Sequence, residues 1–219
     1  MRSERSTEPV EGWRIWNLTE DRTGPWLSPA GSGADRWPRR RPIEARCTVP
    51  GVLKPRRKTH TVPDPDCRCG VHASASLEVF ARTWPAWPPP PVVGTASLWG
   101  RTIEHERGWR SRFAYPTRLR LVCVTCAWVT PGSNTPIVVH RFGRSLYPMC
   151  EDHRGGIEVP DGRRTRPTDQ EPARLQARLL DAYAVDLLPV EQVEPLCGRP
   201  AAPTPPAYMP SIRIVSVGG

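Results

Sequence analysis

The chain has 219 residues, a formal net charge of +9 and 28 prolines, and 38% of its residues are apolar. That length suits one ordinary domain or two small ones, but the apolar share is below the roughly 45–50% of globular proteins. We therefore expect part of the chain not to pack into a core. No run of 18 apolar residues occurs, so we expect no membrane-spanning helix and no membrane partner.

Two further features bear on the compartment and on the partner. The N-terminal sequence MRSERSTEPVEGW lacks the apolar segment of a secretory signal. The seven cysteines of such a chain are expected to be thiols or metal ligands rather than disulfides, so we expect a cytoplasmic protein. Among the 31 basic residues only Lys54 and Lys58 are lysines, a skew typical of GC-rich coding sequences, which makes the arginine count a weaker indication of nucleic-acid binding.

The N-terminal half reads as short strands between loops. Residues 1–11 are a charged segment that we expect to be disordered, and residues 12–18 alternate apolar and polar side chains as a strand does. A second strand is expected near Trp26 and a third over Ile43–Cys47. The segment between Thr48 and Asp66, rich in proline and basic residues, predicts a loop.

The central part predicts one helix and then several strands. Leu77, Phe80, Ala81 and Trp84 fall on one face at helical spacing, which predicts a helix over about residues 73–84 that PAWPPPP ends. Successive strands are then expected over residues 92–105, 109–116, 118–124 and 136–142.

The last predicted element is a helix over residues 168–190. Thr168 with Glu171 three residues later matches a capping box, and Leu175 and Tyr183 belong to an apolar stripe that should dock on another part of the chain. Residues 199–219 form a proline-rich tail that we expect to be disordered.

The pattern as a whole predicts an α+β fold that is mostly β. A β-rich domain should span residues 12–120, a small zinc-ribbon or treble-clef-like module residues 121–156, and a docking helix residues 168–190.

The predicted module contains two ligand pairs at the spacing of a zinc site. Cys123-x2-Cys126 is followed, 23 residues later, by Cys150-x2-His153. Two such pairs supply the four nitrogen and sulfur ligands of a closed tetrahedral zinc site, and a site with all positions filled is structural rather than catalytic. The alternative is two buried thiols, a surface cysteine and a solvated histidine, while His140 lies in the intervening loop as a competing ligand.

A second group of ligand residues precedes the predicted helix. Cys47, His60, Cys67 and Cys69 would make a second, Cys3His metal site, with the loop after Thr48 wrapped around it. A C-x-C pair points its side chains apart unless the backbone turns. The alternative is that Cys47 and Cys69 are small core residues and that His60 is exposed.

Part of the chain resembles a group of proteins of unassigned function from actinobacteria and their phages. The matching residues are His60, Pro63, Cys67, Cys69, Gly70, Ala73, Leu98, Trp99, Gly100, His105, Glu106, Gly108, Arg110, Ala114, Tyr115 and Pro116, whereas His72 and Trp109 stand where that group has tyrosine. The resemblance covers roughly residues 12–120. It favours His60 as a ligand and implies no activity.

Two other sets of residues suggest chemistry. His105 beside Glu106 could act as a general base, with Arg110 holding an anion, and the alternative is an exposed hairpin of mixed charge. Basic residues near tryptophans are typical of surfaces that bind single-stranded nucleic acid, against the alternative of a merely solvated surface. These basic residues are Arg39, Arg40, Arg41, Lys54, Arg56, Arg57, Lys58, Arg118 and Arg120.

The sequence alone therefore favours a non-enzymatic, zinc-stabilised protein that binds nucleic acid. One alternative is a protein–protein adaptor that uses the zinc module and the C-terminal helix, and another is an enzyme with His105 as its base.

Overall fold

The computed structural model describes residues 8–30, 36–47, 60–78, 90–128, 133–159 and 162–196. The described chain is mostly β with a few short helices, which confirms the predicted fold class at that level. The strands are β1 (Val10–Asp21), β2 (Gly24–Pro29), β3 (Ile43–Glu44), β4 (Val71–Ser74), β5 (Val92–His105), β6 (Gly108–Leu121), β7 (Val138–Phe142), β8 (Ser145–Met149), β9 (Arg166–Pro167) and β10 (Asp186–Leu187). The helices are α2 (Val124–Trp128) and α3 (Pro172–Tyr183), with 3-10 turns η1 (Glu151–His153), η2 (Val190–Gln192) and η3 (Glu194–Leu196). No helix among the described residues has the length and apolar character needed to cross a membrane.

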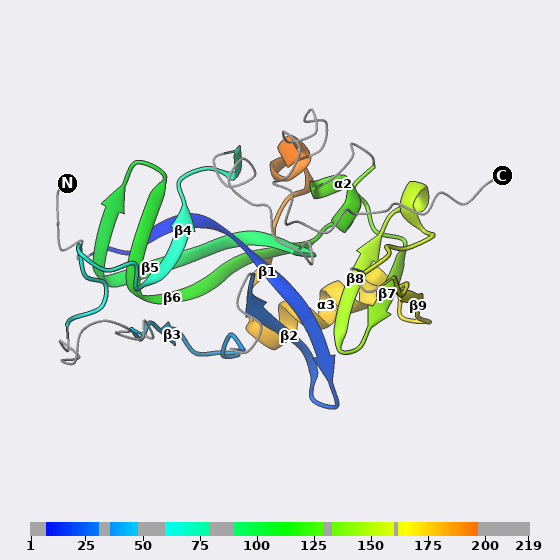
Figure 1. Ribbon diagram of the computed structural model, residues 1–219, viewed down its shortest axis with the longest axis horizontal. Helices are drawn as coiled ribbons and strands as arrows, with labels where there is room; N and C mark the ends of the chain where they lie inside the picture. The colour runs from blue at the N-terminus through cyan, green and yellow to red at the C-terminus, as the bar shows by residue number, and fades with distance from the viewer. Residues whose placement is uncertain are drawn as a thin grey trace.

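The centre of the sheet is the long β5–β6 hairpin together with β1 (Figure 1). β5 pairs with both β1 and β6, and β4 also pairs with both β1 and β6, so these four strands form a closed ring of pairings. The other end of β1 pairs with β2, and Thr19 of β1 pairs with Ser145 of β8. Through β8 the sheet continues into β7 and β9.

The edge of β6 opposite β5 is covered by three short strands in succession. β4 pairs with residues 108–111 of β6, β3 with residues 113–114 and β10 with residues 118–119. An uncovered strand edge is a template for aggregation. Three strands that are far apart in sequence thus cover this edge of β6.

Two predicted strands are in fact one. β6 runs from Gly108 to Leu121 through Pro116, which has no backbone N–H to give to the ladder. A register shift between Thr95 and Ala96 of β5 lies opposite Pro116, and such irregularities are where strands accept proline. The predicted strand over residues 118–124 is wrong at its end, since Val124 begins α2.

Both helix predictions need correction at their N-termini. The helix predicted from residue 73 begins later, because Ala73 and Ser74 belong to β4; Leu77 and Glu78 are helical, and the rest of that prediction lies outside the described residues. The C-terminal helix begins at Pro172 and ends at Tyr183, so the range 168–190 was too long.

The capping box at the start of α3 does not form. The Thr168 hydroxyl donates to the carbonyl of Val139 in β7 (2.9 Å) and accepts from the backbone N–H of Gln170 (3.3 Å). Glu171 is the N-cap residue, without a side-chain capping bond, and Pro172 follows it. Proline suits the first helical position because its fixed φ is already helical and no N–H is needed there.

The main core lies between the sheet and α3. Trp16 and Trp37 are fully buried and meet edge to face, with ring centroids 5.6 Å apart. Leu175, Leu179 and Tyr183 of α3 are also fully buried in this core. The apolar stripe of the helix therefore docks on its own chain, and it is not a free surface for a protein partner.

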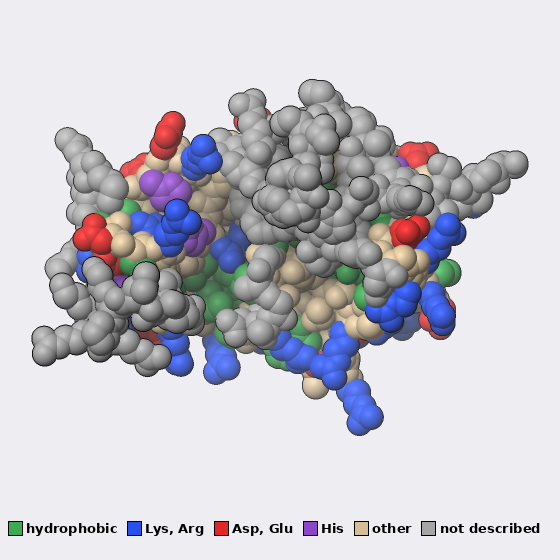
Figure 2. Space-filling model, viewed as in Figure 1, with side chains coloured by type: hydrophobic (Ala, Val, Ile, Leu, Met, Phe, Trp, Pro, Cys, Tyr) green, Lys and Arg blue, Asp and Glu red, His purple; other side chains and the backbone are tan. Residues whose placement is uncertain are grey.

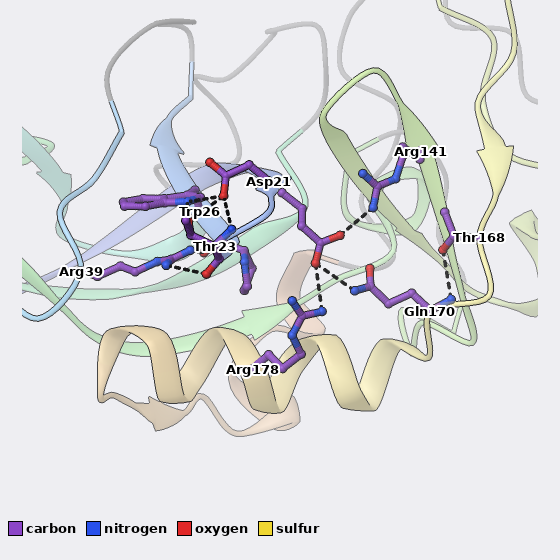
Figure 3. A network of polar contacts seen from close by, with 10 residues as sticks. Asp21, Thr23, Trp26, Arg39, Arg141, Thr168, Gln170 and Arg178 are labelled. Carbon is purple, nitrogen blue, oxygen red and sulfur yellow. Dashed lines mark hydrogen bonds and ion pairs between the residues drawn. The ribbon is translucent and has the colours of Figure 1, made fainter.

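Charged side chains line the surface and also join separate parts of the sheet (Figure 2). Glu20 of β1 accepts hydrogen bonds from Arg141 of β7 (2.6 Å) and Gln170 (3.1 Å) and pairs with Arg178 of α3 (2.9 Å) (Figure 3). Beside it, Asp21 accepts hydrogen bonds from Thr23 and Trp26. This network holds the β1–β2 hairpin, β7 and α3 together.

Candidate metal centres

The first ligand set comes from two strand ends that the sheet brings together. Cys123 lies two residues after β6, and Cys126 lies in α2. Cys150 directly follows β8 and is the N-cap residue of η1, which ends with His153. We call this group, Cys123, Cys126, Cys150 and His153, the buried cluster, because all four residues are buried.

The four ligand atoms of the buried cluster converge on one point. The His153 Nδ1 lies 3.3 Å from the Sγ atoms of Cys126 and Cys150 and 3.7 Å from the Sγ of Cys123. The Sγ atoms of Cys126 and Cys150 are 3.4 Å apart, and all four atoms lie within 4.8 Å of one another. The described cysteines are free thiols. The cluster is thus able to hold a metal ion.

Hydrogen bonds and burial shift the pKa values of the three thiols of this cluster in different directions. A hydrogen bond from the Cys126 thiol lowers the pKa of Cys123 to about 5, helped by backbone N–H groups of Cys126, Cys150 and Thr125 against the effect of burial. The same bond to Cys123, together with burial, raises the pKa of Cys126, and burial raises that of Cys150.

His140 is not a ligand of the buried cluster, although its position in the intervening segment made it a competitor. It is buried, its Nδ1 is 3.1 Å from the Thr165 hydroxyl and its Nε2 is 2.9 Å from the carbonyl oxygen of Arg154. Since a carbonyl only accepts, Nε2 donates to it. His140 thereby fixes the residue that follows the ligand His153.

The second ligand set also comes together, nearer the surface. Cys47 follows β3, while His60, Cys67 and Cys69 precede β4. The Sγ atoms of Cys47 and Cys67 are 3.7 Å apart, the Nε2 of His60 is 3.3 Å from the Sγ of Cys69, and all four ligand atoms lie within 4.8 Å. We call these four residues the outer cluster. It too is able to hold a metal ion.

Arg110 has a role that the sequence did not reveal. Its Nη1 donates to the carbonyl oxygens of Cys67, Cys69 (3.4 Å) and Asp64 (3.5 Å). The guanidinium therefore holds the turn of the C-x-C pair from β6.

The residues predicted for an enzymatic site lie around the turn between β5 and β6 and in the first part of β6. His105 is an exposed residue at the end of β5, and Glu106 follows it in the turn. Partial loss of solvent around the ring and the charges of Arg110 and Arg107 lower the pKa of His105. Arg110 directs its Nη1 at the backbone carbonyls of the outer cluster.

Four of the five described basic residues that were predicted to bind nucleic acid have partners within the chain. Arg39 donates to the carbonyls of Thr23 and Pro25, and Arg120 donates to that of Leu188. Arg40 pairs with Asp181 (3.3 Å) and Arg118 with Glu11 (2.8 Å), whereas Arg41 is exposed. The other four predicted residues, Lys54, Arg56, Arg57 and Lys58, lie outside the described residues.

Comparison with known proteins found no similar protein. No protein-family model matches the chain, and neither the curated proteins nor the solved structures contain a match to it.

Proposed function

We propose that the chain is a zinc-stabilised protein and that its buried cluster holds a structural zinc ion. The distances between the ligand atoms carry this proposal. Zn–S bonds of about 2.3 Å and Zn–N bonds of about 2.0–2.1 Å set the corners of a tetrahedron roughly 3.5–3.8 Å apart. The four measured separations of 3.3–3.7 Å in the buried cluster are close to these values.

The ion would serve architecture rather than catalysis. Three thiolates and one imidazole fill a tetrahedral shell, so no position is left for a water or a substrate. The ion would join the end of β6 to the end of β8, and residues 121–156 would then form a zinc-ribbon-like module. A structural zinc ion contributes on the order of 10 kcal/mol to folding. Free thiols in the described chain suit a reducing compartment, and we propose the cytoplasm.

Metal content and stability of cysteine variants test the zinc proposal. Cys126→Ser should lose one equivalent of zinc per chain and melt at a much lower temperature, because it removes one of the four ligands. The matched control is Cys197→Ser, which alters the one cysteine outside both clusters. If Cys126→Ser does not fold, refolding the natural chain with and without zinc gives the same comparison. Unchanged zinc content and melting temperature in Cys126→Ser would overturn the proposal.

We further propose that the module, together with residues 162–167 that follow it, binds single-stranded nucleic acid. Arg144 on the module and Arg164 and Arg166 just after it are exposed, and Arg166 lies in β9, which pairs with β7 of the module. The guanidinium of Arg163 stacks on the ring of Phe142, 4.7 Å from the ring centroid. Basic side chains are visible at the right-hand end of Figure 2, where Figure 1 places β7 and β9. Arginines with an aromatic platform suit a phosphate backbone with stacked bases. The net charge of +9 supports the same partner.

Salt-dependent binding to single-stranded DNA and RNA tests this part. Binding should be tight at low salt and weaken steeply as salt rises, because bound counterions are released. Arg166→Ala should reduce the slope of log K against log salt by about 0.7. Arg112→Ala is the control, since Arg112 is already paired with Glu44 at 2.7 Å on a different part of the sheet. No binding to either nucleic acid at low salt would contradict the proposal.

A further inference from the structure

The outer cluster has the geometry of a second tetrahedral site. Its two close ligand pairs are Cys47 with Cys67 at 3.7 Å and His60 with Cys69 at 3.3 Å. The first lies within the roughly 3.5–3.8 Å edges of a zinc tetrahedron and the second is slightly shorter. The ligands come from two separate segments of chain. Such a convergence of three thiols and one imidazole is the ligand set of a closed Cys3His zinc site.

The backbone around the outer cluster is held in a form that permits the C-x-C pair to act together. Gly70 has φ of +124°, and an added Cβ there would lie 3.1 Å from Pro63 and 3.2 Å from Arg110. The backbone N–H of Cys67 donates to the carbonyl of Asp64 (3.1 Å). Together with the bonds from Arg110 to the carbonyls of this turn, these contacts bring both cysteines toward His60.

The two clusters differ in their access to solvent. All four residues of the buried cluster are buried, with Cys123 and Cys150 at 0% exposure. In the outer cluster Cys47 is exposed, His60 and Cys67 are half-buried, and only Cys69 is buried. A small chelator can reach an ion at the outer cluster directly, whereas it reaches the buried cluster only after local unfolding.

We propose that the outer cluster binds a second zinc ion that exchanges with solution while the protein stays folded. This ion would link the segment after β3 to the segment before β4, and these two strands lie in succession along the same edge of β6. β3 is short: it pairs with β6 through Ile43 and Glu44, the backbone N–H of Ala45 donates to the carbonyl of Arg112, and Glu44 pairs with Arg112. The second ion would add to these few contacts, and its loss would loosen the segment after β3.

Chelation of the full chain tests the second site independently of the first. Protein purified with zinc should contain two equivalents per chain. A coloured chelator such as 4-(2-pyridylazo)resorcinol should take up one equivalent quickly under native conditions, and the other only after denaturant is added. During the fast release the amides of residues 43–47 should lose protection from hydrogen exchange, while those of β8 keep it.

The variants Cys47→Ser and His60→Ala show whether the quickly released zinc comes from the outer cluster. Each variant should contain one equivalent less, should lack the fast phase and should keep the slow one. Cys197→Ser, as control, should keep both phases. A natural chain whose only equivalent is released slowly, a fast phase that survives in both variants, or release of both equivalents at one rate would each overturn the proposal. Loss of the slow equivalent alone would instead count against the buried cluster, so the two proposals fail separately.

Discussion

Gly156 lies where the backbone passes closest to the histidine that supports the buried cluster. Its φ is +82°, and an added Cβ would lie 2.5 Å from the Nδ1 of His140 and 2.6 Å from the Thr165 hydroxyl. His140 in turn donates to the carbonyl of Arg154, which follows the ligand His153. A side chain at this glycine would therefore disturb the segment that carries a ligand.

Gly156→Ala should destabilise the protein more than Gly162→Ala. The two glycines share nearly the same φ, +82° and +79°, but nothing lies within 4 Å of a Cβ built on Gly162. Both variants should lose about 1 kcal/mol to backbone strain, and Gly156→Ala a further 1–3 kcal/mol or so because buried atoms must move. Urea unfolding measures both. Equal losses would show that the contact with His140 is easily relieved.

The sequence was informative about which residues form the clusters and silent about which residues support them. The spacing of Cys123 with Cys126 and of Cys150 with His153 identified the residues of the buried cluster, because it is the spacing of zinc ligand pairs. The outer cluster was predicted from its residue types, since Cys47 lies 20 residues from Cys67. The sequence did not identify His140 and Arg110 as supports, since a buttressing hydrogen bond to a backbone carbonyl leaves no spacing in the sequence.

At the scale of elements, α3 is joined to the sheet through the hydroxyl of Tyr183. This hydroxyl accepts from the backbone N–H of Leu27 and donates to the carbonyl of Trp37, both at 2.9 Å. Tyr183 is fully buried, and burial raises its pKa to about 12. One side chain therefore satisfies the backbone N–H of Leu27 in β2 and the backbone carbonyl of Trp37, both far from Tyr183 in sequence.

Tyr183→Phe should cost about 1–3 kcal/mol, because both backbone groups lose their partner in the core. It should also change the alkaline limit of stability. The folded-state pKa lies above the ordinary value of 10, so the contribution of Tyr183 is complete below about pH 10 and falls as the pH rises toward 12, by up to roughly 3 kcal/mol.

Chemical denaturation at several pH values between 8 and 12 measures this dependence. The natural chain should lose stability more steeply than Tyr183→Phe across that range. Parallel curves for the two proteins would show that ionisation of Tyr183 is not linked to folding.

The elements themselves were predictable where the local pattern and the packing agree. The stripe of Leu175, Leu179 and Tyr183 has helical spacing and is buried as expected. The sequence was misleading at Ala73–Ser74, whose small residues are compatible with a helix. They lie in strand β4 instead, because β1 and β6 pair with β4 on either side. It also misplaced the start of α3, since Thr168 bonds to β7 rather than to the helix.

At the scale of the molecule, Glu20 connects three parts of the chain with a single carboxylate. Its side chain is 11% exposed and contacts Arg141, Arg178 and Gln170. Burial alone would raise the pKa of Glu20, but the hydrogen bonds from Gln170 and Arg141 and the charges of both arginines outweigh burial and lower it. The carboxylate is thus stabilised in its charged form.

Glu20→Gln should lower the free energy of unfolding by about 1–3 kcal/mol, because two arginines lose their common anion in a mostly buried site. Glu151→Gln is the control: Glu151 is 61% exposed and pairs with Arg154 at 2.9 Å, and such surface pairs contribute roughly 0–1 kcal/mol.

The pH dependence of this difference follows from the lowered pKa. The contribution of Glu20 should be complete above its ordinary pKa of 4.5 and should be lost as the pH falls through the folded-state value. Unfolding curves of the natural chain and Glu20→Gln from pH 7 downward should therefore converge. A gap that does not narrow in acid would contradict this account.

The sequence by itself determined the mostly β class, the residues of the two candidate ligand sets and the docking face of α3, because each follows from residue types and local patterns along the chain. Only the tertiary structure decided that β3 and β4 share one edge of β6, that Glu20 joins β1 to β7 and α3, and that Arg39, Arg40, Arg118 and Arg120 have partners within the chain. These features depend on contacts between residues far apart in sequence. Pairing of strand edges and of charges over such distances is fixed by how the whole chain packs, and no local pattern encodes it.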